Sequence, residues 1–426
     1  MPGWLRRRTL PIRNVGIIPA DVIVRKEGDQ AVAIDGETKE VIARSSDHAE
    51  VIQAAINKYD VVYIKKNKYE ISDHITLRSN IVIFSNGAKL IRVSDLSPYA
   101  ILYGEQLTDV EIYGIVFDGN KDVGAGGHII HLKDVENIKI RRCKFINPYN
   151  YGIWIKSVSS TNKRVSVIDN VFVGSGPNDV IAIDGYEHII ALNKFYDVET
   201  DVYAIGAADL FHSVIFGNVM EKVKTGIGLD GGSSGIEGNI ITSNDILDPD
   251  VYAIFLNGKA GSATAKNNII NGNLVWTRTS HLDAGIYMTY TYETQVIGNI
   301  IRSKDNVGYG IYESDAANDN VIAFNHITRC NVAIRKGGAN TVVFENYGYK
   351  TINTDVAIFS GDGTTTQFKV EHGLSSIPSK IIVTPLSADA KDFAYATADD
   401  TYIYFNFSTA PPSGTDNVKL SWYAEV

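Results

Sequence analysis

A short motif recurs along the middle of this 426-residue chain, and its period constrains the fold more than any other feature. The motif is glycine or alanine, then isoleucine, then a variable residue. Successive copies begin 22 to 32 residues apart, at Gly152, Ala182, Ala204, Gly226, Ala253, Gly285, Gly310 and Ala333. A repeat of this length is typical of solenoid proteins, in which each repeat forms one structural unit.

A second motif interleaves with the first and keeps the same period. It is an asparagine that precedes a short apolar run, and its steps are 21 to 29 residues long. The asparagines are Asn170, Asn193, Asn218, Asn244, Asn273, Asn299, Asn325 and Asn346. Cys143 and Ile115 extend this register upstream. Because two different motifs share one period, the repeat reflects structure and not chance similarity.

The segments between the motifs alternate apolar and polar residues, as short β-strands do, and are separated by glycine, asparagine and aspartate turns. Most periods leave no room for a ten-residue helix. The chain is therefore predicted to be all-β, with a right-handed parallel β-helix in which each repeat is one coil. Equivalent residues of successive coils would lie about 4.8 Å apart. The recurring asparagines then fit an internal ladder of hydrogen-bonded amides.

Three regions are predicted along the chain. Residues 1–44 form an N-terminal segment with a β-hairpin, whose turn is marked by Asp35 and Gly36. Residues 45–354 form the β-helix, which opens with a short amphipathic helix that Ser46 or Asp47 would cap. This helix would close the open end of the solenoid core. Residues 355–426 lose the period and read as a small antiparallel β-sandwich.

The opening of the repeat region resembles the pectate-lyase-like superfamily. The resemblance rests on residues 45–56, then on 60–72 with their tyrosines, and on 81–91. That superfamily includes lyases, hydrolases, epimerases and catalytically silent adhesins, so the resemblance implies the fold and leaves the chemistry open. The C-terminal segment, with Phe368–Leu374 and a closing Trp422, resembles the terminal modules of tail fibre and tailspike proteins. That likeness implies a homotrimer at a virion surface or in another extracellular setting.

Composition excludes some partners. The chain has 40 Lys and Arg against 49 Asp and Glu, a formal charge of −9, which argues against nucleic-acid binding. No stretch approaches eighteen apolar residues, so no membrane insertion is expected. The basic N-terminus is followed by no apolar segment before Arg13, and no secretion signal is readable there.

The repeat predicts an outward surface that would bind a glycan. If the isoleucine of each motif points inward, the next residue and the one two further on point outward. The first outward column would be Trp154, Asp184, Gly206, Gly228, Phe255, Tyr287, Tyr312 and Arg335, and its companion would include Lys156, Tyr186, Ala208, Asp230 and Asn257. Small residues flanked by aromatic rings would form a trough for sugar rings. The aromatic residues would equally fit a plain ladder or a contact with a neighbouring subunit.

Aspartates are the candidate catalytic groups of this trough. Asp184, Asp209 and Asp230 would supply the acid and the base of a glycosidase. Asp179 stands where polygalacturonase-like hydrolases carry a paired aspartate, although the Gly-His-Gly and Arg-Ile-Lys elements of that family are absent. For any single one of these aspartates, a solvated turn residue is the favoured interpretation.

Lyase chemistry is the alternative reaction in the same trough. It would need a base, for which Tyr287, Tyr312, His281 and Arg335 are candidates, and often a Ca²⁺ ion as cofactor. A hydrolase needs no cofactor. No metal site is otherwise expected, because His128 and His131 lack a third ligand, and Cys143 and Cys330 lie too many coils apart for a disulfide.

Two functions from different classes therefore remain. The first is a tailspike-like enzyme that degrades a surface or extracellular polysaccharide, as a glycoside hydrolase in preference to a lyase. The second is a non-catalytic fibre or adhesin that uses the trough to bind a glycan receptor.

Overall fold

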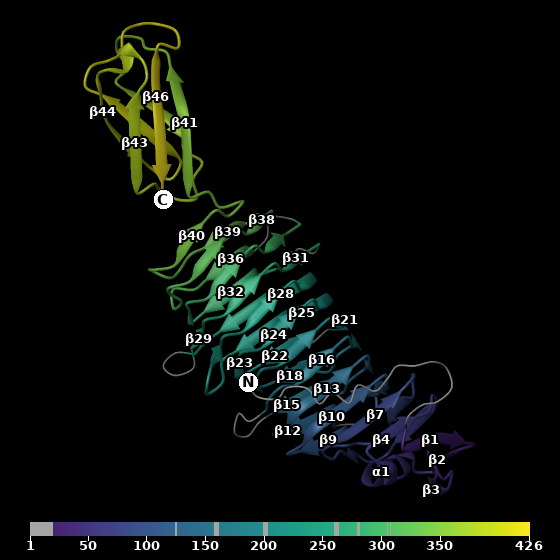
Figure 1. The fold of residues 1–426 in the computed structure, drawn as a ribbon. Helices are drawn as coiled ribbons and strands as arrows, with labels where there is room; N and C mark the ends of the chain where they lie inside the picture. The colour runs from purple at the N-terminus through teal and green to yellow at the C-terminus, as the bar shows by residue number, and fades with distance from the viewer. Residues whose placement is uncertain are drawn as a thin grey trace.

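The computed structural model describes residues 20–123, 126–156, 162–198, 203–259, 264–278, 282–304, 306 and 308–426. His281, a candidate lyase base, lies outside these ranges. Figure 1 shows an elongated stack of coils that runs from the N-terminal strands to a separate C-terminal domain beyond the last coil. The all-β prediction and its parallel β-helix are confirmed, because strands of successive coils pair in parallel and in register.

Each coil contributes strands to faces that extend along the solenoid. The first face is a 15-stranded sheet. Its strands are, in spatial order, β3 (Val41–Ser45), β2 (Gln30–Asp35), β1 (Val22–Glu27), β4 (Val61–Ile64), β7 (Ile81–Ser85), β10 (Thr108–Tyr113), β13 (Glu136–Arg141), β16 (Ser166–Ile168), β20 (Ile189–Ala191), β24 (Val214–Phe216), β27 (Ile240–Thr242), β30 (Ile269–Asn271), β34 (Gln295–Ile297), β37 (Val321–Ala323) and β40 (Val342–Phe344).

The second face follows the first in each coil. Its strands are β5 (Lys68–Ile71), β8 (Lys89–Arg92), β11 (Val116–Asp118), β14 (Lys144–Ile146), β17 (Val171–Val173), β21 (Lys194–Val198), the first part of β25 (Val219–Asp230), the first part of β28 (Asp245–Asn257), β31 (Leu274–Trp276), β35 (Ile300–Arg302) and β38 (His326–Thr328). β25 and β28 continue onto the third face, so these two coils join the faces without a break.

The third face carries the outward columns predicted from the repeat. Its strands are β6 (Ile75–Thr76), β9 (Ala100–Glu105), β12 (His128–Lys133), β15 (Ile153–Lys156), β18 (Ile181–Ile183), β22 (Ile205–Ala207), the last parts of β25 and β28, β32 (Ala284–Thr289), β36 (Tyr309–Glu313) and β39 (Val332–Arg335). A narrow five-stranded sheet then leads back to the first face through β19 (Gly185–Tyr186), β23 (Leu210–Phe211), β26 (Ile236–Glu237), β29 (Ala265–Lys266) and β33 (Thr291–Tyr292).

The core of the solenoid is a set of stacked apolar side chains. Phe117, Phe145, Phe172 and Phe195 point inward from successive coils, and neighbouring rings stack with centroids 4.7 to 5.3 Å apart. The N-terminal end of this core is closed by helix α1 (His48–Lys58), as predicted. Its cap is Asp47, whose Oδ1 accepts the backbone N–H groups of Ala49 and Glu50.

The predicted asparagine ladder is confirmed. The side-chain oxygen of Asn193 accepts both the backbone N–H and the Nδ2 of Asn170, each at 3.0 Å, and the same pattern repeats down to Asn346. Cys143 takes the equivalent upstream position and donates its backbone N–H to Asn170. The ladder therefore satisfies buried backbone groups at the turn between the first and second faces.

A second polar ladder, which the repeat motifs did not reveal, lines the turn before the first face. It uses different residue types in successive coils, and so it has no single-letter signature. His188 donates its backbone N–H to Ser213 Oγ, Ser213 donates its own to Asn239 Oδ1, and Asn239 donates to Asn268 Oδ1. These bonds hold the opposite edge of the first face in register.

The terminal regions differ in detail from the predictions. The N-terminal segment is a three-stranded antiparallel meander, β1–β2–β3, and not a single hairpin; the predicted turn at Asp35 and Gly36 joins its second and third strands. The C-terminal sandwich begins earlier than residue 355, because β41 already starts at Ile352.

The C-terminal domain has two antiparallel sheets packed around Trp422 and Phe405. One sheet contains β41 (Ile352–Phe359), β46 (Val418–Glu425) and β43 (Lys380–Pro385), and the other contains β42 (Gln367–Glu371), β45 (Tyr402–Phe407) and β44 (Phe393–Ala398); a short 3-10 helix, η1 (Ala388–Ala390), lies between β43 and β44. None of the helices in the described ranges is both long and apolar enough for a membrane crossing.

We expect Asn244→Ala to destabilise the solenoid by about 2–4 kcal/mol, because it leaves buried donors and an acceptor of two neighbouring coils unpaired. Asn244 Oδ1 accepts from Asn218, and its Nδ2 donates to Ile215 O and Asn273 Oδ1. Thr242→Ala, an outward change in the same coil, is the control and should change the free energy of unfolding little. Denaturant titration followed by circular dichroism measures both variants, and equal losses would contradict the structural role of the ladder.

Candidate functional site

The third face carries one continuous outward column across the solenoid. Register places in it Thr76, Tyr103, His131, Trp154, Ala182, Gly206, Gly228, Phe255, Tyr287, Tyr312 and Arg335. The predicted placement of Trp154, Phe255, Tyr287, Tyr312 and Arg335 in this column is confirmed. Three small residues interrupt the aromatic series between Trp154 and Phe255, which leaves a gap.

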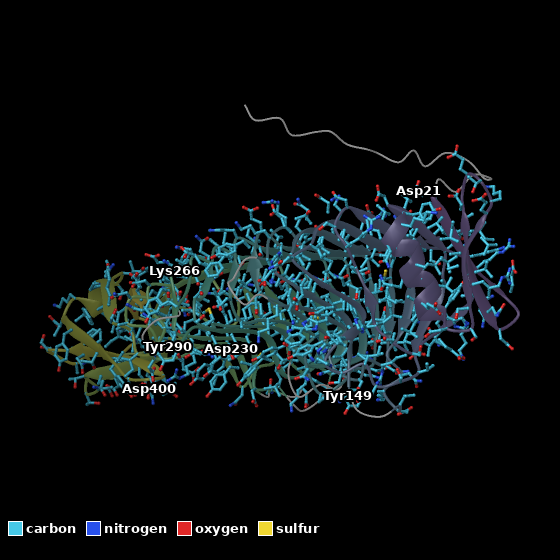
Figure 2. The ribbon with its side chains drawn as sticks, turned by 90° about the horizontal axis from the view of Figure 1, so that it is seen from below. Asp21, Tyr149, Asp230, Lys266, Tyr290 and Asp400 are labelled. Carbon is cyan, nitrogen blue, oxygen red and sulfur yellow. The ribbon has the colours of Figure 1, made fainter. Side chains whose placement is uncertain are left out.

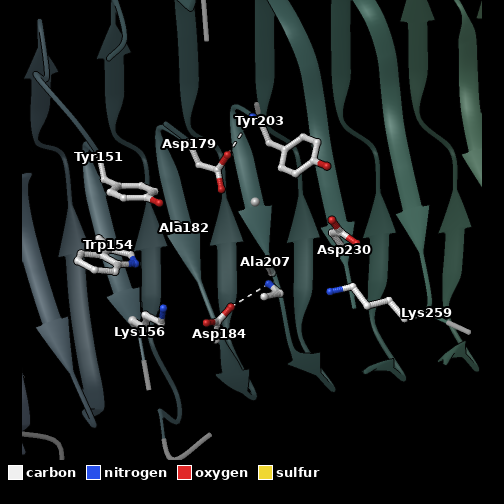
Figure 3. Close-up of a pocket in the computed structure, with 12 residues that line it drawn as sticks. Tyr151, Trp154, Lys156, Asp179, Ala182, Asp184, Tyr203, Ala207, Asp230 and Lys259 are labelled. Carbon is white, nitrogen blue, oxygen red and sulfur yellow. Dashed lines mark hydrogen bonds between the residues drawn. The ribbon is translucent and has the colours of Figure 1, made fainter. Parts of the chain in front are cut away.

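A groove of about 270 Å³ occupies this gap. Its lining residues are Tyr151, Trp154, Lys156, Asp179, Ala182, Asp184, Tyr203, Gly206, Ala207, Ala208, Asp230 and Lys259. Figure 3 shows the three carboxylates surrounding the hollow, with the Tyr151 and Trp154 rings at one side. Figure 2 places Asp230 between Asp21 and Asp400 along the molecule, so the groove lies well inside the length of the solenoid.

Asp179 is the most perturbed acid of the groove. It precedes β18, and its Oδ1 accepts the backbone N–H of Tyr203 at 3.0 Å. Burial raises its pKa from the ordinary 3.8 to about 7; the Tyr203 amide opposes this rise, and the charge of Asp184 adds to it. A carboxyl group in this environment retains its proton near neutral pH and is suited to act as a general acid.

Two glycines create the space in which Asp179 and Tyr203 sit. A Cβ atom on Gly206 would clash with Oδ2 of Asp179, and one on Gly228 would clash with the Tyr203 ring. Both glycines occupy outward positions that carry aromatic side chains in later coils. Their lack of a side chain therefore lets these two groups fold down onto the sheet and shape the floor of the groove.

Asp184 and Asp230 lie in the companion column, together with Lys156, Ala208 and Asn257. The Asp184 Oδ1 accepts the Ala208 backbone N–H at 2.8 Å, and the Asp230 Oδ1 accepts Nδ2 of Asn257 at 2.8 Å. Burial raises the pKa of Asp184, against the lowering effect of the Ala208 amide. Strand stacking separates the Asp184 and Asp230 Cα atoms by two coils, about 10 Å.

The register of one coil was predicted wrongly. Ala182 pairs with Trp154 and Gly206, so Asp184 belongs to the companion column and not to the first one. The coil carries two inward isoleucines, Ile181 and Ile183. Strand alternation alone does not show which of them corresponds to the isoleucine of the motif. The same two-residue shift moves Tyr186 out of the trough. It lies in β19 and stacks on Phe211 with centroids 4.7 Å apart.

Asp209 is also displaced from its predicted place, since it is not among the groove-lining residues. Its carboxylate accepts the backbone N–H groups of Ser233, Ser234 and Gly235 in the turn of the next coil. A Cβ on Gly232 would clash with the same carboxylate. The structure thus gives Asp209 the position of a turn-stabilising residue, which was the alternative reading of these aspartates.

The motif spacing missed five groove residues, namely the side chains of Tyr151, Tyr203 and Lys259 and the two alanines Ala182 and Ala207. Tyr151 lies three residues before Trp154 and stacks on it with centroids 5.1 Å apart. Asp179 and Tyr203 hold the same position relative to Ala182 and Gly206. The two-residue alternation of a strand no longer applies at this third outward position. A search for polar and aromatic residues three positions before the first outward column would have found Tyr151 and Tyr203.

Aromatic pairs flank the groove on both sides. On the C-terminal side, Tyr252 stacks on Phe255 at 5.2 Å and Tyr287 on Tyr312 at 4.7 Å between ring centroids. Arg335 lies over Tyr312 and forms an ion pair with Asp315 at 3.0 Å. On the N-terminal side the His131 ring stacks on Trp154 with centroids 4.1 Å apart.

The histidines of this region are buried and uncharged. Burial lowers the pKa of His128 to about 3 and of His131 to about 4, so both are neutral in the folded protein. Within the described ranges, no group of three or more His, Cys, Asp and Glu side chains is arranged to hold a metal ion. A calcium ion used by a lyase would therefore need further oxygen ligands, such as backbone carbonyls or asparagine side chains.

Comparison with known proteins agrees with this fold. Residues 126–301 match the family described as a right-handed β-helix region, and no curated protein matches the chain. A mutant tailspike protein of E. coli bacteriophage HK620, in complex with a pentasaccharide, is 12% identical; the match covers 92% of this chain and 92% of that one, with a TM-score of 0.57. PfbA, a surface adhesin of Streptococcus pneumoniae, is 15% identical over 71% of this chain and 88% of its own, with a TM-score of 0.53.

These identities show the fold alone. They confirm the right-handed parallel β-helix, which is the fold that the resemblance to the pectate-lyase-like superfamily implied. They assign no reaction, so the chemistry rests on the groove itself.

We expect the stability of the protein to depend on the protonation of Asp179. Because its folded pKa of about 7 lies above the ordinary 3.8, its contribution is fully present below about pH 4 and is lost as the pH rises through about 7. We therefore expect the thermal midpoint of the wild type, measured by circular dichroism between these pH values, to fall relative to that of Asp179→Asn as the pH rises. Parallel curves would contradict the buried, protonated state.

Proposed function

We propose that the protein is a glycan-active β-helix protein of the tailspike kind that hydrolyses a glycosidic bond in the groove of the third face. The observation that carries this proposal is the raised pKa of Asp179 in a gap between aromatic surfaces, with Asp184 and Asp230 on the same floor. Aromatic rings on both sides suit the apolar faces of sugar rings. The Lys156 and Lys259 side chains at the rim can donate to hydroxyl or carboxylate groups of the glycan.

In this mechanism Asp179 protonates the leaving oxygen of the glycosidic bond. Asp230, held by the Asn257 amide, acts as the base that takes a proton from the attacking water, while Asp184 balances the positive charge that develops on the sugar. The acid and the base come from coils that are two apart, Asp179 from the coil of Ala182 and Asp230 from the coil of Gly228. A wide spacing of this kind supports an inverting reaction, since inverting enzymes hold their two carboxyl groups about 6.5–9.5 Å apart to accommodate a water molecule. No cofactor takes part in these steps.

A non-catalytic glycan receptor is the second candidate function. The aromatic column favours it, because Tyr287, Tyr312 and Trp154 extend beyond the acids and would bind a glycan whether or not it is cleaved. Tailspike and surface adhesin structures share the fold, and one of those tailspike structures contains a pentasaccharide. In either function we place the protein at a virion surface or in another extracellular setting, as a homo-oligomer such as a trimer that presents several grooves at once.

The hydrolase proposal is tested by incubating the protein with a panel of neutral and acidic polysaccharides. We expect new reducing ends without the ultraviolet absorbance of an unsaturated product. Such absorbance would identify a lyase instead. Asp179→Asn should lower kcat by about 100-fold to 10,000-fold because the general acid is lost. For the wild type, kcat/KM should fall above about pH 7 as Asp179 loses its proton.

Asp209→Asn is the matched control, because it changes an aspartate of an adjacent coil that binds the turn and does not line the groove. It should retain kcat. Glycan binding without new reducing ends, measured by calorimetry on the same panel, would favour the receptor function; loss of that binding in Trp154→Ala would place the glycan in the groove. Full activity of Asp179→Asn would contradict the assigned acid.

A further inference from the structure

The first face has an outer surface that the groove does not use. From β16 to β40, each of eight strands presents two outward positions. One column is Ser166, Ile189, Val214, Ile240, Ile269, Gln295, Val321 and Val342, and the other is Ile168, Ala191, Phe216, Thr242, Asn271, Ile297, Ala323 and Phe344. None of these sixteen positions, all within the described ranges, carries a charged residue; fourteen of them are at least partly exposed, whereas Ala191 and Ala323 are buried. We call this surface the aliphatic face.

Its character is specific to this part of the molecule. Upstream on the same sheet, the outward positions include Glu111, Lys139 and Arg141, and Arg141 forms an ion pair with Glu111 at 2.6 Å. On the second face, the outward positions of the same coils include Lys194, Glu221 and Arg302. An uncharged outer surface is therefore not a general result of stacking coils in this chain.

The turn at the edge of the aliphatic face shows an independent sign of selection. The residue after each strand has a positive φ. Gly217, Gly272 and Gly298 fill this position in three coils, and Asp169, Ser243 and Glu345 fill it in three more. In two others it is Leu192 and Phe324, with φ of 58° and 57°. A bulky residue in this conformation is unfavourable by roughly 1–2 kcal/mol, yet both side chains are exposed, Leu192 to 49% and Phe324 to 58%.

In one coil next to each of them glycine fills the same site, Gly217 after Leu192 and Gly298 before Phe324. Leu192 lies against Gly217 in the monomer, yet about half of its surface stays exposed. Phe324 contacts the Phe344 ring edge-on at 5.3 Å between centroids and so extends the aliphatic face sideways. Leu192 extends it at the other end. The opposite edge is polar, with Glu187, Glu293 and Asp319 at the equivalent turn. An uncharged and mostly apolar centre with a polar rim is the composition of a protein interface.

The size of the surface identifies the kind of partner. The sixteen outward positions together with Leu192 and Phe324 give 18 residues, close to the roughly 20–30 that each partner contributes to a stable interface. Permanent homo-oligomer interfaces are more apolar than transient ones, because they are never exposed in the functional protein. An apolar surface of this extent needs an occupant that is present whenever the chain folds, and another copy of the same chain meets that condition.

We propose that the aliphatic face is the self-association surface of the protein and packs against the aliphatic face of a second copy, with the two solenoids side by side. The groove lies on the third face and stays open in such an assembly. Leu192 and Phe324 would then be kept in their strained conformation because they contact the partner. The C-terminal domain is not needed for this contact.

The test compares the mass of full-length variants by sedimentation velocity. Ile240→Lys/Ile269→Lys places two charges at the centre of the aliphatic face on positions that are already outward. Leu274→Lys/Ile300→Lys is the matched control, because it makes the same change at adjacent outward positions of the second face in the same region. We expect the wild type and the control to sediment as an oligomer. The Ile240→Lys/Ile269→Lys variant should associate about 100-fold more weakly, or sediment as a monomer. Its circular dichroism spectrum should be unchanged.

A second pair of changes keeps the proposal testable if the lysine variant fails to fold. Leu192→Gly/Phe324→Gly removes the two strained residues, so its monomer should be no less stable than the wild-type monomer, while its association should weaken by about tenfold. A monomeric wild type overturns the proposal. An oligomer that resists the substitutions on the aliphatic face also overturns it, and would assign assembly to another surface such as the C-terminal domain. Neither result bears on hydrolysis, which is measured separately.

Discussion

Hydrogen bonding between successive coils is the constraint on which the rest of this structure depends. Parallel strands hold equivalent residues about 4.8 Å apart, and two polar ladders extend the same register through the turns. In the first ladder, each asparagine oxygen accepts two donors of the coil before it. The turns therefore cannot slide relative to the strands, and a residue in one coil faces its equivalent in the next. Every outward column of the molecule follows from this alignment.

The groove is an interruption in such a column. An aromatic residue at one position stacks on the equivalent ring of the next coil, as Tyr287 does on Tyr312. When two coils in succession carry glycine instead, the column opens by about two strand spacings. Asp179 and Tyr203 then fold into the opening from the position three residues earlier. In this recess the Asp179 carboxyl group is largely shielded from water, although it still borders the groove. This burial raises its pKa.

The sequence predicted those parts of the structure that repeat. The period, the asparagine ladder and the column from Phe255 to Arg335 could be placed because several coils supply the same residue type at the same position. The errors arose where one coil departs from the pattern. Ile181 and Ile183 made two registers equally good, which misplaced Asp184 and Tyr186. Asp209 was indistinguishable from a groove acid until its bonds to residues 233–235 were known.

The departures from the pattern are also where the proposed site and the proposed assembly surface lie. A solenoid is stabilised by uniform coils, so substitutions that break uniformity need a separate reason to persist. The glycines at positions 206 and 228 give up stacking contacts on the third face and open a site there. Leu192 and Phe324 accept an unfavourable backbone conformation on the first face and extend an apolar surface there. The first and third faces are separate. The glycines of the third face can therefore serve the proposed chemistry, and Leu192 and Phe324 of the first face the proposed assembly, without one set constraining the other.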